Sequence, residues 1–139
     1  MEKANENAKA TVTEKAYSVK IIFCSDDELS VKDRIVLKEM SDNIKLDDVV
    51  TSDKSINIKP IRYAVLKVHN ENSENKDYEV VVIECEDGFK YQTSSTSFKD
   101  KFEDLFSDLK DIEEEWAIKV LKKDSTNYKG KQFLTCTVV

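Results

Sequence analysis

Residue types that build catalytic sites are scarce in this chain of 139 residues. It has only two glycines, Gly88 and Gly130, and each is typical of a turn, so there is no glycine-rich loop to bind phosphate. His69 is the only histidine, which excludes a paired-histidine zinc motif and leaves no Ser–His or Cys–His pair at a usable spacing. These absences disfavour an enzyme. The sequence predicts a binding protein without catalytic residues.

Cysteine is scarce as well. Cys24, Cys85 and Cys136 are an odd number, lie far apart in or at the end of apolar runs, and form no Cys-x-x-Cys pair. We expect buried, reduced thiols rather than a zinc site or a disulfide framework. The sequence therefore predicts no metal and no cofactor, and it predicts that His69 lies in a polar loop.

Long apolar runs are absent, so the sequence predicts no membrane span, and residues 1–16 lack the apolar core of a secretory signal. We expect a cytoplasmic protein. The length fits one domain. The net charge of −6 disfavours nonspecific coating of duplex DNA by bulk attraction but still allows a local basic groove.

The most informative stretch is residues 116–139, which has two alternating runs around a polar turn and predicts a β-hairpin. Alternation places Trp116, Ile118 and Val120 on the inner face, together with Leu134, Cys136 and Val138. The outer positions carry lysines, Phe133 and two threonines. Five lysines oppose one acid here, giving +4 in a chain of −6, so the hairpin is a basic feature of an acidic protein. A solvated hairpin with lysines that guard an edge strand is the simpler alternative.

Other segments predict a mainly β protein with one long helix. Residues 1–16 are expected to be a mobile arm, 17–24 is β-rich, and 31–40 fits a helix or a strand equally well. Three strands follow at 56–68, 78–85 and 89–93, where Pro60 indicates a bulge or an edge and Asp87-Gly88 a tight turn. Phe98 to Ile112 has the apolar spacing of a helix that is buried on one face, and Ser97 with Asp100 resembles a capping box.

Three strands, a helix and two strands are the element order of the OB-fold, a five-stranded Greek-key barrel. We therefore predict an α+β protein with an OB-like five-stranded barrel. One domain would span 17–139, with 17–50 as an extension and 56–139 as the barrel core. The loops that bind ligands in that fold would be residues 70–77 and 124–130, and the second of these holds the basic turn with Tyr128.

Lysines and aromatic rings on one face are typical of proteins that bind single-stranded nucleic acid, where lysines contact phosphates and rings stack on bases. Alternation places Phe89 and Tyr91 on the same face of their strand, but it does not say whether each ring lies in the core or at the surface. We expect Phe89 in the core and Tyr91, whose hydroxyl needs water or another partner, at the surface. The predicted nucleic-acid-binding residues are Lys59, Arg62, Tyr63, Tyr91, Lys119, Lys123, Tyr128, Lys129, Lys131 and Phe133.

From about Ser41 onward the chain resembles the small single-stranded DNA-binding proteins of tailed bacteriophages of Gram-positive hosts, including those of protein-primed phages. The similar stretches are IKPI at 58–61, VVVI at 80–83, DGFKY at 87–91, SS at 94–95, W at 116 with IKV at 118–120, and STNYKGK at 125–131. The resemblance implies an OB-like protein that coats exposed strands during phage DNA replication, with Tyr91 in contact with bases. Glu113 to Glu115 differ from the Gly or Pro expected before Trp116.

The partner that this resemblance implies is single-stranded DNA, and replication proteins or a second copy of the chain are further partners that the sequence leaves open. The alternative function is an acidic interaction protein that imitates DNA and inhibits a host nucleic-acid-binding or defence protein. Its acids would lie on the outer face of the long helix, at Asp100, Glu103, Asp104, Asp108 and Asp111. Absence of DNA binding by the isolated chain would favour this alternative.

Overall fold

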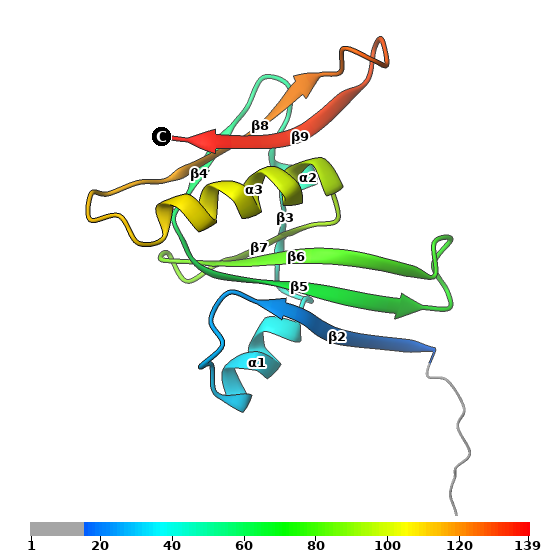
Figure 1. Cartoon of the computed structure of the whole chain (residues 1–139). Helices are drawn as coiled ribbons and strands as arrows, with labels where there is room; N and C mark the ends of the chain where they lie inside the picture. Colours follow the sequence, from blue (N-terminus) through cyan, green and yellow to red (C-terminus); the bar gives the residue numbers. More distant parts are fainter. Residues whose placement is uncertain (1–15) are drawn as a thin grey trace, which may run out of the picture.

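A computed structural model describes residues 16–139, which form eight strands and three helices (Figure 1). The expected mobile arm lies almost wholly outside these residues. In chain order the elements are β2 (Tyr17–Cys24), α1 (Val31–Lys38), β3 (Ile44–Lys45), α2 (Leu46–Val49), β4 (Ile56–Ile58), β5 (Pro60–Asn70), β6 (Asp77–Cys85), β7 (Lys90–Thr93), α3 (Thr96–Leu109), β8 (Ile118–Asp124) and β9 (Gln132–Val138). The prediction of a mainly β, α+β protein is confirmed.

The strands form two open sheets. One has five strands in the order β2-β5-β6-β7-β3, and the other has three in the order β4-β8-β9. Only β3 and β7 pair in parallel, and the other neighbours are antiparallel. Figure 1 shows the smaller sheet above α3 and the larger sheet below it.

A bend in the chain connects the sheets. β4 and β5 are separated only by Lys59, yet β4 pairs with β8 and β5 pairs with β6. The register of β5 shifts between Pro60 and Arg62, which confirms the irregularity predicted from Pro60. Proline has no N–H to donate to a neighbouring strand, so the ladder is interrupted where the chain passes from one sheet to the other.

Helix α3 fills the space between the sheets. The side-chain oxygen of Ser95 accepts a hydrogen bond from the backbone N–H of Phe98 and caps the first turn. Phe98, Phe102 and Phe106 are buried in the main core, as the apolar spacing predicted. The helix ends at Leu109 rather than at Ile112.

The predicted capping box is wrong, because Ser95 is the cap. The Ser97 hydroxyl instead donates to the carbonyl of Leu134 on β9 and ties the helix to the smaller sheet.

The predicted closed barrel is not confirmed. Among residues 16–139 no strand of one sheet pairs with a strand of the other, so the two sheets do not close into a barrel. The side chains of α3 pack where such pairing would otherwise lie. A helix with three large buried phenylalanines keeps the sheets apart, and its apolar face is covered by both of them.

Residues 17–50, predicted as an extension, contribute the two edge strands of the larger sheet and part of the core. The ambiguous segment 31–40 contains a helix, α1, capped by Ser30. Its Leu37 is fully buried in a second core on the face of the sheet opposite α3, with Ala64, Leu66 and Val82. Among the described residues no helix is long and apolar enough to cross a membrane.

Candidate nucleic-acid interface

The predicted hairpin is confirmed, and its register defines an outer face. Lys119 lies opposite Thr137, Leu121 opposite Thr135, and Lys123 opposite Phe133. The inner positions Ile118, Val120, Leu134 and Cys136 are buried and attach the hairpin to the main core, as predicted. Trp116 is partly buried there, with its ring 6.2 Å from that of Phe106. Val138, expected inside, is 45% exposed because it lies at the last residue of the edge strand.

An aromatic ring and a lysine lie side by side on this outer face. Phe133 is 38% exposed and is the direct cross-strand neighbour of Lys123. Side chains at opposite positions of an antiparallel pair have Cβ atoms about 5 Å apart. Lys119 lies four residues earlier on the same face, about 13 Å away along the strand. The face can therefore place two cations and one ring along a single extended ligand.

Two further lysines lie in the turn between β8 and β9. The Ser125 hydroxyl accepts hydrogen bonds from the backbone N–H groups of Asn127 and Tyr128, and the Ser125 N–H donates to the Lys131 carbonyl over 2.9 Å. Gly130 has a φ of 80°, a conformation that a residue with a side chain rarely adopts. The turn is thus held by hydrogen bonds among its own residues. It leaves Tyr128 69% exposed, with Lys129 and Lys131 exposed on either side of Gly130.

Four of the five hairpin lysines have no acidic partner in the part of the chain that the structure describes. Within residues 16–139, no carboxylate lies within ion-pair distance of Lys119, Lys123, Lys129 or Lys131. The single acid of the hairpin, Asp124, accepts a hydrogen bond from the Gln132 side chain over 3.0 Å. Lys122 is the exception among the five lysines, since its ammonium donates to the carbonyl of Asp47.

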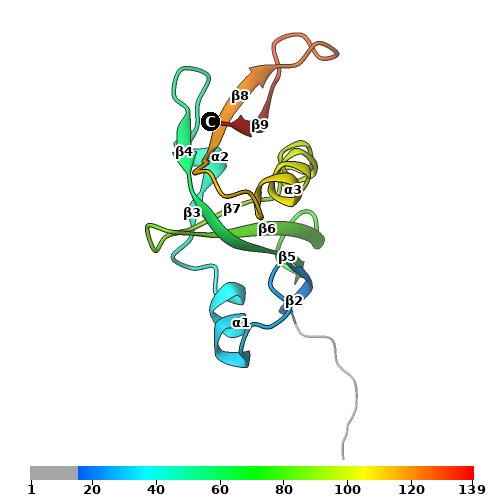
Figure 2. The same cartoon turned by 60° about the vertical axis from the view of Figure 1, so that its left-hand side comes forward.

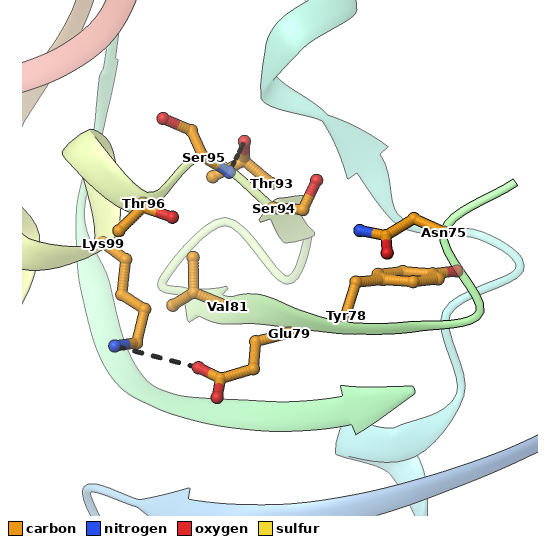
Figure 3. Close-up of a pocket in the computed structure, with 9 residues that line it drawn as sticks. All are labelled: Asn75, Tyr78, Glu79, Val81, Thr93, Ser94, Ser95, Thr96 and Lys99. Carbon is orange, nitrogen blue, oxygen red and sulfur yellow. Dashed lines mark hydrogen bonds and ion pairs between the residues drawn. The ribbon is translucent and has the colours of Figure 1, made fainter. Parts of the chain in front are cut away.

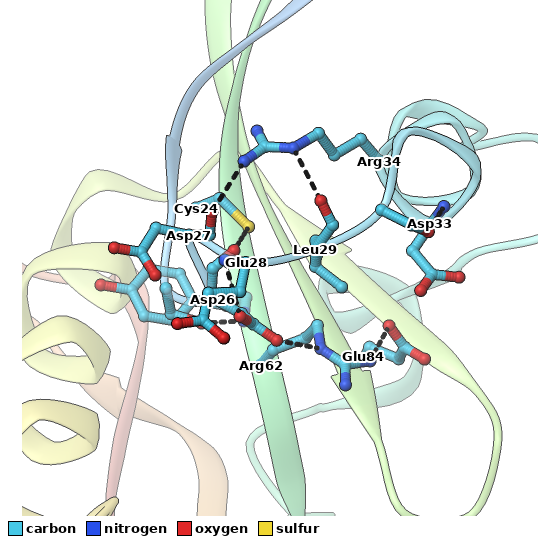
Figure 4. A network of polar contacts seen from close by, with 12 residues as sticks. Cys24, Asp26, Asp27, Glu28, Leu29, Asp33, Arg34, Arg62 and Glu84 are labelled. Atoms are coloured by element: carbon cyan, nitrogen blue, oxygen red, sulfur yellow. Dashed lines mark hydrogen bonds and ion pairs between the residues drawn. The ribbon is translucent and has the colours of Figure 1, made fainter.

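Two other predicted cations are already paired with acids. Lys59 lies 3.8 Å from Glu115 at the bend between the sheets. Arg62 donates to Glu84 over 2.9 Å, lies 3.6 Å from Asp26, and has only 25% of its side chain exposed (Figure 4). The bond to Glu84 raises the pKa of Arg62 despite partial burial. These two residues are not part of the hairpin face. The contacts of Arg62 connect β5 to β6 and to the loop that holds Asp26.

Two predicted stacking rings lie in the core. Tyr63 is 5% exposed, and its ring is in edge-to-face contact with two rings of α3. Its ring centroid lies 5.1 Å from that of Phe102 and 5.2 Å from that of Phe106. Burial raises the pKa of Tyr63, and the nearby Glu103 carboxylate, which accepts a hydrogen bond from the Tyr63 hydroxyl, raises it further. Tyr91 is 9% exposed, and burial together with its hydrogen bond to Asp87 raises its pKa to about 12. Neither ring is available to a base at the surface.

The expectations for Phe89 and Tyr91 were therefore reversed. Phe89 is 56% exposed because it belongs to the turn after Gly88 and precedes β7, which begins at Lys90. Tyr91 and Thr93 point toward α3, and the Tyr91 hydroxyl finds a partner in Asp87 without reaching solvent. Strand alternation predicted that the two positions share a face, but the strand starts one residue later than expected.

One residue on the hairpin face was not identified from the sequence pattern. Asn57 of β4 is exposed and lies opposite Lys119, so the row Asn57, Lys119 and Thr137 crosses all three strands of the smaller sheet. Asn57 and Lys119 are about sixty positions apart, and only the pairing of β4 with β8 brings them together. Their side chains can donate hydrogen bonds to phosphate or sugar oxygens.

A separate groove, of about 430 Å³, opens at the N-terminus of α3 beside β6 and β7 (Figure 3). Hydroxyl groups of Thr93, Ser94 and Ser95 line it, and Lys99 is its cation. The Lys99 ammonium lies 3.5 Å from Glu103 and 4.0 Å from Glu79, so its charge is already balanced. This groove is a weaker candidate than the hairpin for an anionic ligand.

His69 lies in the last part of β5 rather than in a loop, with Asp77 and Glu71 as partners. No group of three or more histidine, cysteine or acidic side chains in residues 16–139 is arranged to hold a metal ion. Comparisons of the chain with protein-family models, with curated proteins and with solved structures found no match.

Proposed function

We propose that this protein binds single-stranded DNA on the outer face of the β8–β9 hairpin. The observation that carries the proposal is the set of four lysines, Lys119, Lys123, Lys129 and Lys131, which have no acidic partner in the described chain and surround two exposed rings. A solvated edge needs lysines, but it gains nothing from exposed Phe133 and Tyr128 beside them.

In this proposal the lysines contact phosphates while the two rings stack on bases. Stacking contributes about 1 to 3 kcal/mol per base and tolerates any sequence, because every base has a flat face. Phosphate contacts release counterions, so binding weakens as salt rises. The protein would act by sequence-tolerant coating, without catalysis, and would protect exposed strands during the DNA replication of a phage or mobile element in its host's cytoplasm.

The order of elements supports the same proposal. From β4 and β5 through β6, β7, α3, β8 and β9 the order is that of the OB-fold, and the loop between β8 and β9 corresponds to one of the loops that bind ligands there. We propose that the fold is an opened relative of that barrel, in which α3 occupies the place of one strand pairing.

The test is fluorescence anisotropy of labelled oligo-dT with the full chain, at several salt concentrations and with duplex of equal length as competitor. Four phosphate contacts predict a slope of about −3 in log K against log salt, so affinity should fall by about fiftyfold between 50 and 200 mM salt. Lys123→Gln should make the slope shallower by about 0.7. Phe133→Ala should weaken binding by about fivefold or more without changing the slope.

Lys32→Gln is the matched control, because it removes the same charge from α1, at the opposite end of the molecule from the hairpin (Figure 1). It should leave both affinity and slope unchanged. No binding at low salt would refute the proposal. Equal effects of Lys32→Gln and Lys123→Gln would indicate bulk attraction rather than a site on the hairpin.

The second candidate, an acidic protein that imitates DNA, is favoured by one observation. Asp100, Asp104 and Asp108 repeat every four residues along α3, all three are exposed, and none has an ion-pair partner among residues 16–139. Such spacing places them in one row on the helix surface. This candidate predicts no binding of oligo-dT and binding instead to a basic DNA-binding protein, so the same anisotropy measurement distinguishes the two.

A further inference from the structure

Helix α1 exposes an apolar face that its own fold does not use. Val31 is 74% exposed and Ile35 60% exposed, whereas Leu37 of the same helix is fully buried against the larger sheet. Positions 31, 34, 35 and 38 lie on one side of a helix, so the two aliphatic side chains share that side with Arg34 and Lys38. A face of this composition is typical of a surface that binds another molecule.

The exposed face of α1 lies beside an open sheet edge. In the described chain β2 pairs with β5 on one side and with no strand on the other, and α1 lies next to it (Figure 2). A groove of about 470 Å³ runs between them, lined by Lys20, Ile21, Val31, Arg34, Ile35 and Lys38. Because Lys20 and Ile21 are consecutive strand residues that point to opposite faces, the groove follows the strand edge itself.

The edge can accept an extended chain over a limited length. The register of β2 shifts between Ile21 and Phe23, so the regular edge is Tyr17 to Ile21. An edge strand presents backbone N–H and C=O groups that a further strand can pair with, while side-chain pockets beside it select alternate residues of that strand. Val31 and Ile35 would supply the apolar contacts for those residues.

The charge of the groove selects the occupant. Three of its six lining residues are cationic and none is acidic, in a chain of net charge −6. The Arg34 side chain donates hydrogen bonds to the backbone carbonyls of Leu29 and Asp27, which carry no charge. Figure 4 shows that the side chain of its neighbour Asp33 points in a different direction from α1. Asp33 contributes instead to the charge environment of Arg62. The positive charge of the groove is therefore not cancelled by its own helix.

This charge disfavours two other occupants. A second copy docked edge to edge would bring two sets of Lys20, Arg34 and Lys38 together, which is repulsive. A nucleic acid strand would satisfy the cations but not the backbone groups of the edge, and the groove has no aromatic ring to stack on a base.

We propose that the groove between β2 and α1 binds an extended segment of a partner protein in which acidic and aliphatic residues alternate. The segment adds a strand to the edge of β2, its aliphatic side chains face α1 and contact Val31 and Ile35, and its acids point to the opposite face, where they pair with Lys20. Arg34 and Lys38 attract the acidic segment at longer range. This site is at the opposite end of the molecule from the hairpin (Figure 1), and it does not depend on the DNA-binding proposal.

The test uses a labelled peptide of about nine residues with alternating Glu and Val, a typical strand length, and anisotropy with the full chain. Ile35→Glu should weaken binding by at least about tenfold, because it removes an aliphatic contact and adds a like charge. Val36→Glu is the matched control: Val36 is on the other side of α1 and 50% exposed, so the same chemical change should have no effect. Both positions are exposed, so neither variant should unfold the chain.

Hydrogen exchange locates the peptide. Saturation with the peptide should slow exchange of backbone amides in Tyr17 to Ile21, while a control peptide of alternating Lys and Val should leave them unchanged. The proposal is overturned if the Glu-Val peptide does not bind at millimolar concentration, or if Ile35→Glu and Val36→Glu act equally. Oligo-dT that displaces the peptide, or a dimer of the chain alone that Ile35→Glu abolishes, would assign the groove to nucleic acid or to a second copy.

Discussion

Phe102 should be the residue on which the connection between the two sheets most depends. It is fully buried at the middle of α3, with ring centroids 5.6 Å from Phe98, 5.8 Å from Phe106 and 5.1 Å from Tyr63. Since no strand of one sheet pairs with a strand of the other in residues 16–139, these rings form much of the contact between them. Phe102→Ala would leave a cavity that faces both sheets.

The expected cost is about 3 to 5 kcal/mol, the range for truncation of a buried phenylalanine. Domains of this size are stable by about 5 to 15 kcal/mol, so the variant should be close to unfolding in the least favourable case and keep about four fifths of its stability in the most favourable one. With a urea m-value of about 2 kcal/mol per molar, the midpoint should fall by about 2 M. Emission of Trp116, the only tryptophan, reports the transition because its ring contacts Phe106.

Phe89→Ala is the matched control, because it deletes the same atoms from a side chain that is 56% exposed. We expect a change within about 0.5 kcal/mol. The reasoning is refuted if Phe102→Ala costs less than about 1 kcal/mol, or if the two variants cost the same. The second result would mean that the sequence-based placement of Phe89 in the core was correct and the described packing is not.

Three further predictions follow from single sites. His69 is hydrogen-bonded to Asp77 over 2.8 Å and to Glu71 over 2.5 Å, and these bonds raise its pKa. The stabilisation by protonated His69 should therefore be present below the ordinary histidine pKa and be lost as pH rises through the folded-state pKa. Urea unfolding at several pH values should show this loss for the native chain and not for His69→Gln. Cys85 and Cys136 are buried, and burial raises the pKa of each to about 12. One thiol per native chain, that of Cys24, should therefore react rapidly with a disulfide reagent, and all three should react in denaturant. Rapid reaction of two or three thiols in the native chain would contradict the packing. Lys119→Gln combined with Lys123→Gln should make the salt slope of oligo-dT binding shallower by about 1.4, and an unchanged slope would place the DNA elsewhere.

The sequence was sufficient for features that depend on residues close together in the chain. The alternation of Ile118, Val120, Leu134 and Cys136 predicted the hairpin and its buried face, since successive strand side chains must point to opposite sides. The apolar spacing from Phe98 predicted α3, and Pro60 predicted the irregularity of β5. Of the ten predicted binding residues, six lie together on the hairpin and are exposed or partly exposed: Lys119, Lys123, Tyr128, Lys129, Lys131 and Phe133.

Only the tertiary structure decided how these elements meet. A closed barrel would need strands of the two sheets to pair at a second edge. Whether they pair there or pack against a helix depends on side-chain volumes across the core, and these cannot be inferred from a local sequence pattern. The same holds for Tyr63 and Tyr91, whose hydroxyls could have reached water but bind Glu103 and Asp87 inside the protein. Pairing of Arg62 with Glu84 and of Asn57 with Lys119 likewise joins segments that are distant in the chain. Local sequence therefore determined the elements and their faces, and long-range packing determined which of those faces remain available to a partner.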